Sequence, residues 1–254
     1  MNPQAQPATI YNEITDQIND LLRDNGRFLK ESDLAIRALT AKCDQLVKID
    51  AIRGWITYAR IAQLCGNEER FRYCIRNASR LDPSEEWEGT NAVGLMNLGH
   101  FSESAVIFSK LVDPRTGNFS AIYPGALCSG AFFRVLECYN ALPSMGIDMP
   151  SDFPLHIVEA AVETMRSAQV SDEAVSKFLD MAGKVLRDHK CMHAVGGPTA
   201  EITEVDASPI LHLKFRLNLD PNEIADANFD LACLVAEAHA SIPPNVHISF
   251  GSDR

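Results

Sequence analysis

The apolar residues of this chain repeat with a helical period up to about Lys190 and alternate along the backbone after it. Side chains three and four residues apart share one face of a helix, whereas alternate side chains share one face of a strand. We therefore expect a mostly α fold, in which an antiparallel array of helix hairpins precedes a small C-terminal α/β element of strand, helix and strand.

The helical part shows apolar stripes bounded by capping and turn residues. Together these stripes predict about seven helices before residue 143. Their approximate ranges are 9–25, 32–49, the two halves of 52–83, the two halves of 85–114, and 124–142.

Proline and glycine divide the chain once more. The segment from Pro143 through Pro154 contains three prolines and one glycine, which prevent a continuous helix there. We expect a disordered tail over 1–8, a helical repeat-like domain over 9–142, a linker over 143–153, and helices with a small mixed sheet over 154–254. The last region begins with helices at about 154–168 and 172–189.

The clearest strand lies at 210–219, where Leu211, Leu213 and Phe215 alternate with polar residues. Asp220-Pro221 then starts a helix to about residue 240, and alternation returns at 246–250. A strand–helix–strand unit of this length favours a right-handed parallel crossover. Shorter strands are expected at 202–205 and 192–195.

Composition excludes several classes of protein. A net charge of -11 disfavours non-specific binding to nucleic acid. The polar N-terminal segment is no secretory signal, and no apolar run approaches the ~20 residues of a membrane-spanning helix. The seven irregularly spaced cysteines are typical of free thiols, so we expect a cytoplasmic protein without a membrane partner.

Residues 52–83 carry a specific pattern of large and small residues. Trp55 and Ala59 lie in the first helix, Gly66 in the turn, Ala78 in the second helix, and Pro83 closes the segment. With these residues the segment resembles one tetratricopeptide repeat. Segment 85–114 resembles a second repeat more weakly.

The resemblance implies a concave groove that binds a protein or peptide. The groove positions in this sequence are Arg53, Ile56, Arg60, Gln63 and Leu64. Two arginines on one face could hold an acidic segment of the partner. The alternative is that both are ordinary solvated surface residues.

His212, Lys214 and Arg216 project together from the polar face of the 210–219 strand. They form a second candidate surface for an acidic partner. The alternative is a solvated outer face, which one-sided sheets commonly show.

His189, Cys191 and His193 are the densest cluster of metal-ligand residue types. We favour a simpler explanation, a helix C-terminus whose carbonyl dipole attracts imidazoles, and we expect no metal and no cofactor. Sequence motifs of hydrolases, kinases and dinucleotide enzymes are absent, so no catalytic residue is assigned.

These observations predict a non-enzymatic cytoplasmic interaction protein, such as an adaptor, a chaperone-like protein or a regulator. One alternative is a subunit of a larger assembly that pairs through its C-terminal sheet. A second is a small metal-dependent hydrolase that uses the His-Cys-His cluster. Homo-oligomerisation is left open.

Overall fold

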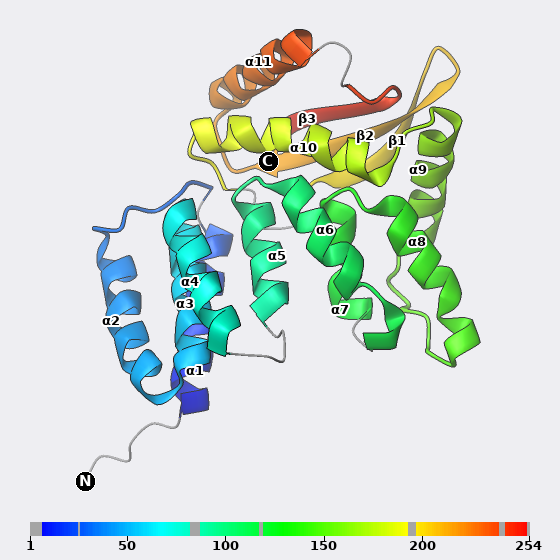
Figure 1. The fold of residues 1–254 in the computed structure, drawn as a ribbon. Coiled ribbons are helices and arrows are strands. Elements are labelled where there is room, and N and C mark those ends of the chain that lie inside the picture. Colours follow the sequence, from blue (N-terminus) through cyan, green and yellow to red (C-terminus); the bar gives the residue numbers. More distant parts are fainter. Residues whose placement is uncertain are drawn as a thin grey trace.

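The computed structural model describes residues 7–24, 26–81, 87–116, 119–192, 197–238 and 242–252. Figure 1 shows an array of helices beside a small sheet. The α-helices are α1 (Pro7–Asp24), α2 (Leu34–Ile49), α3 (Ala51–Leu64), α4 (Glu68–Leu81), α5 (Trp87–Asn97), α6 (Phe101–Leu111), α7 (Phe119–Cys128), α8 (Phe132–Ala141), α9 (Leu155–Ser167), α10 (Asp172–Asp188) and α11 (Pro221–Ala238). The strands are β1 (Thr199–Val205), β2 (Ser208–Leu217) and β3 (Val246–Ser252), and two short 3-10 helices are η1 (Pro114–Thr116) and η2 (Pro143–Met145).

Successive helices form hairpins that stand side by side (Figure 1). The hairpins are α1–α2, α3–α4, α5–α6 and α7–α8. Their first helices pack on one another in order: α1 contacts α3, α3 contacts α5, and α5 contacts α7. In the α3–α4 turn, Gly66 has φ +64° and donates its N–H to the carbonyl of Gln63 at 3.0 Å. Glycine adopts this left-handed conformation without the cost that a Cβ would add. The expected fold class, mostly α with a C-terminal α/β element, is confirmed.

The helix expected at 124–142 is wrong, because two helices occupy this region. Helix α7 begins earlier, at Phe119, and a turn separates it from α8. Gly130 in that turn has φ +91°, and the N–H of Ala131 closes the turn on the carbonyl of Ala126 at 3.0 Å. The apolar run continues through the turn because the turn itself is buried, so hydrophobicity did not reveal the break.

One apolar core extends across the predicted linker at 143–153. It joins Ala92 in α5 to Phe250 in β3, while a second cluster holds the helices from Ile14 to Leu98. Phe153 anchors the end of the segment by stacking on Tyr139, with ring centroids 4.0 Å apart. The two clusters therefore meet within α5, which contributes Ala92 and Met96 to the first and Leu95 to the second, and not at the proline-rich segment. Residues 1–6 of the predicted tail lie outside the described part, and helix α1 begins at Pro7.

The sheet has the order β1-β2-β3, with β1 antiparallel and β3 parallel to β2. The predicted parallel crossover through α11 is confirmed. Leu211, Leu213 and Phe215 are buried on the face toward the helices. The ring of Phe215 packs on Phe101 of α6, with ring centroids 5.6 Å apart. Helices α9, α10 and α11 all contact the sheet. The strand expected at 202–205 is part of β1, and residues 193–195 of the other expected strand lie outside the described ranges.

Helix α10 ties the ends of the hairpins together. The carboxylate of Asp172 accepts hydrogen bonds from the second and third N–H groups of α8, both at 3.0 Å. Asp180 accepts from the N–H of Ser102 at the start of α6, also at 3.0 Å. Arg187 donates to the carbonyl of Gly99, which lies in the turn after the C-terminus of α5, at 2.7 Å. Because these three side chains are spaced by about two helical turns, one face of α10 caps three helix ends.

Candidate functional site

The groove positions predicted in α3 are mostly buried. Ile56, Gln63 and Leu64 are 6%, 3% and 0% exposed. Helices α1, α2, α4 and α5 all pack against α3 and cover it. In this arrangement these three residues offer no surface to a partner.

The two remaining α3 positions both contact helix α1. Arg60 donates to the side-chain oxygen of Asn19 at 2.6 Å. The guanidinium of Arg53 lies over the ring of Tyr11, 5.3 Å from its centroid. Both arginines therefore already have partners within the chain, and α1 lies where the groove ligand was expected.

His189 and Cys191, two of the three residues suggested as metal ligands, have other side-chain and backbone partners in the structure. His189 Nε2 lies 2.8 Å from a carboxylate oxygen of Asp230, and Cys191 is buried in a backbone bridge with Arg27. His193 lies outside the described residues. Within the described ranges, no three His, Cys, Asp or Glu side chains are arranged to hold a metal ion.

The basic residues of β2 lie together on the face of the sheet that points away from the helices. His212, Lys214 and Arg216 alternate with the buried leucines and phenylalanine of the same strand. The parallel register places His247 beside His212, with ring centroids 4.8 Å apart. His212 Nε2 also lies 2.7 Å from Ser249 Oγ. We call these four residues, His212, Lys214, Arg216 and His247, the basic strip.

Lys214 is held close to the backbone of β3. A Cβ atom built on Gly251 would lie 2.6 Å from its Cε, so the side chain crosses the strand where glycine leaves room. Arg216, which lies beside Gly251 in the register, is exposed. The positive charge of Lys214 therefore lies over the β2–β3 pair.

The surroundings of His212 disfavour its protonated form. Burial lowers the pKa of His212, and repulsion from His247 and Lys214 lowers it further. Glu201, opposite His212 on β1, acts in the other direction. An acidic ligand would add negative charge here and would favour the protonated imidazole.

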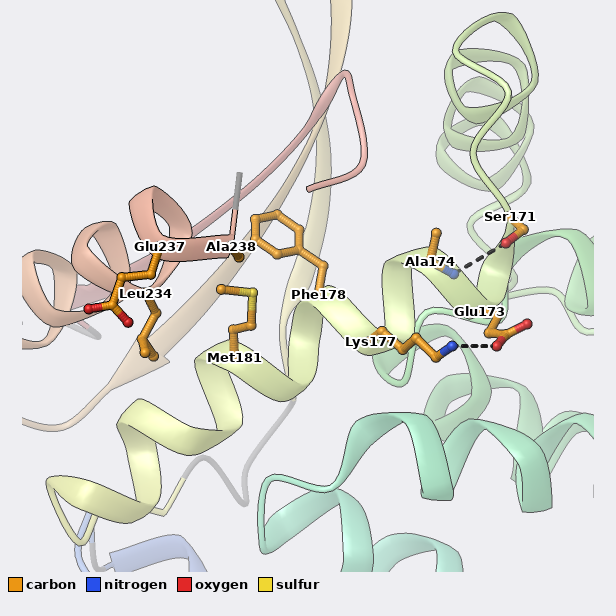
Figure 2. A pocket seen from close by; sticks show the side chains of 9 residues that line it. All are labelled: Ser171, Glu173, Ala174, Lys177, Phe178, Met181, Leu234, Glu237 and Ala238. Carbon is orange, nitrogen blue, oxygen red and sulfur yellow. Dashed lines mark hydrogen bonds and ion pairs between the residues drawn. The ribbon is translucent and has the colours of Figure 1, made fainter. Parts of the chain in front are cut away.

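A cleft of about 720 Å³ lies between α10 and α11. Figure 2 shows Phe178 and Met181 pointing from α10 toward Leu234 and Ala238 of α11. At the rim, Lys177 Nζ forms an ion pair with Glu173 at 2.6 Å. The cleft is thus lined by apolar side chains of both helices and by the charged side chains of Glu173, Lys177 and Glu237.

Sequence reasoning did not identify this cleft. Its residues come from two helices that are separated by the β1–β2 hairpin, so no local motif joins them. One available signal was α11 itself, which is apolar on several sides, whereas a helix with one covered face has a polar outer face.

Within the described residues, no helix has the length and apolar character needed to cross a membrane. Comparison of the chain with known protein families, with curated proteins and with solved structures found no match in any of the three.

Proposed function

We propose that this chain is a non-enzymatic interaction protein, of the adaptor or chaperone-like kind, that binds an acidic segment of a partner on the basic strip. The observation that carries the proposal is the gathering of His212, Lys214, Arg216 and His247 on one open sheet face. The whole chain has a net charge of -11, so this face is a local exception. Opposite charges on two proteins speed their encounter and select partners.

The helical array serves as the support of this surface. Phe215 lies on the opposite, buried face of the same strand. It packs on Phe101 of α6 within the shared core. The strip is therefore backed by a packed core, and a surface that is ordered before binding lowers the cost of association. The seven free thiols support a reducing compartment, and we place the protein in the cytoplasm.

One contact restricts the alternative of an assembly subunit that pairs through its sheet. The side-chain amide of Asn228 accepts from the N–H of Phe250 at 3.0 Å and donates to its carbonyl at 2.9 Å. Helix α11 thereby occupies backbone groups on the outer edge of β3 that an added strand would need. Strand addition would have to use the outer edge of β1.

A fluorescent peptide of consecutive glutamates tests the proposal by anisotropy titration. Binding should be lost in Lys214→Glu/Arg216→Glu and should weaken with salt, since exposed charges are screened over about 8 Å at physiological ionic strength. The matched control is Lys48→Glu/Arg76→Glu, which changes the net charge equally at two exposed positions elsewhere. Equal losses in both double variants would show a response to net charge alone and would refute the strip as the binding site.

A further inference from the structure

The outer surface of α11 exposes an apolar stripe. Phe229 is 69% exposed, although the helix buries Ile224, Ala227 and Leu231 on its other side. Small residues surround Phe229 on the exposed side. We call the set the outer stripe: Ala225, Phe229, Ala232, Cys233 and Ala236, all exposed. Residues three, four and seven positions apart lie along one helix face, so the stripe is continuous.

An acidic row runs beside the stripe. At 100° per residue, Glu223, Asp226, Asp230 and Glu237 fall within a narrow sector of α11 next to the stripe. The helix contains no lysine or arginine. Glu223 pairs with Arg27, and Asp230 with His189. Asp226 and Glu237 form no ion pair with any described residue, so their charges remain available to a partner.

The shape of the stripe suits another helix. Alanine side chains allow two helix axes to approach within the ~8–10 Å of close helix packing. Phe229 supplies the large aromatic group that commonly dominates binding energy at interfaces. A flat polar surface, such as a sheet face, would leave Phe229 without an apolar pocket.

We propose that the outer stripe binds an amphipathic helix of a partner protein, with apolar residues on one face and lysine or arginine along one border. The basic border would lie against the acidic row. A second copy of this chain fits less well, because pairing two α11 helices brings two acidic rows together on molecules that each carry a net charge of -11.

The proposal is independent of the basic strip. The strip lies on the open face of the sheet, whereas α11 packs with α10 in the helical layer. The two surfaces have opposite charge and call for partners of opposite charge. Loss of glutamate-peptide binding and loss of basic-helix binding can therefore be measured separately.

The test uses a synthetic helical peptide as long as α11, 18 residues. It carries leucine and alanine on one face and lysine along one border, and a second peptide has glutamate in place of lysine. Isothermal titration with the full chain should detect binding of the lysine peptide only. Phe229→Ala and Asp226→Lys/Glu237→Lys should each weaken that binding about tenfold or more, and salt should abolish the second effect.

Controls keep the outcome specific. Leu34→Ala removes another exposed apolar side chain, 83% exposed, and Asp16→Lys/Glu159→Lys reverses two acidic residues elsewhere. Wild-type affinity in both controls supports the proposal. The same affinity in Phe229→Ala, or equal losses in controls and test variants, overturns it.

Cys233 reports on the occupant directly. All seven cysteines lie in the described ranges, and Cys233 is the exposed one. The lysine peptide should slow its reaction with a thiol reagent, and the glutamate peptide should not. Rapid disulfide crosslinking of two chains through Cys233, together with a dimer in sedimentation that Phe229→Ala dissolves, would show a second copy on the stripe and would overturn the proposal.

Discussion

A Cβ atom built on Gly183 would lie 2.0 Å from the carbonyl oxygen of Gly99. Helix α10 therefore crosses the α5–α6 turn with the two backbones in contact. Gly99 has φ +76°, and Arg187, one turn beyond Gly183, donates to its carbonyl at 2.7 Å. This contact fixes the distance between the helical array and the layer that supports the sheet.

Gly183→Ala should destabilise the protein, although alanine is the better helix former. The inserted methyl group meets backbone atoms, so we expect a net loss of about 1–3 kcal/mol in the free energy of unfolding. Gly89→Ala in α5 is the control, because nothing lies within 4 Å of a Cβ there. It should gain about 0.5–1 kcal/mol. Urea denaturation measures both, and equal effects would contradict the close crossing.

Asn228→Ala should expose the backbone groups of Phe250 on the edge of β3. A lost side-chain hydrogen bond costs about 0.5–1.5 kcal/mol, and this amide makes two with Phe250. We expect faster hydrogen exchange of the Phe250 amide, measured by NMR. Asn12→Ala, at an exposed position in α1, is the matched variant and should leave that exchange rate unchanged.

Trp55→Ala should cost less than the loss of a fully buried aromatic. Trp55 is half-buried, and its ring packs edge-on against Tyr73 with ring centroids 5.8 Å apart. Phe71 of the same hairpin is 0% exposed. We expect Phe71→Ala to lose about 3–5 kcal/mol and Trp55→Ala roughly half of that. Thermal melts that rank the two in the opposite order would contradict this assignment.

The pKa of His212 predicts a pH dependence of stability. Burial and neighbouring positive charge lower it below the ordinary value of about 6.5, so the unfolded state binds a proton more readily than the folded state. Stability should therefore fall as the pH drops below about 6.5, and the loss should level off below the folded-state pKa.

His212→Gln should remove this part of the pH dependence. The difference in melting temperature between neutral and mildly acidic buffer should shrink in the variant. His156→Gln replaces an exposed histidine of α9 and should retain the wild-type difference. A wild-type pH profile in His212→Gln would show that this imidazole does not couple to folding.

Local patterns in the sequence predicted the elements well where one face alone is covered. The alternation of Leu211, Leu213 and Phe215 with polar residues predicted β2, and the capping residues Asp220 and Pro221 predicted the start of α11. The same reasoning failed at Gly130, because a buried turn leaves the apolar run unbroken. Periodicity reports which side of an element is covered, and it contains no information about which element covers it.

The sequence by itself therefore determined the helical array, the late change to strands and the alternation that places His212, Lys214 and Arg216 on one face. Only the tertiary structure decided that α1 packs on Arg53 and Arg60, and that His247 lies beside His212. The exposure of Phe229 on α11 was likewise decided only by the tertiary structure. The physical reason is that propensity and periodicity are local, whereas these contacts join residues far apart in the chain through packing and strand register.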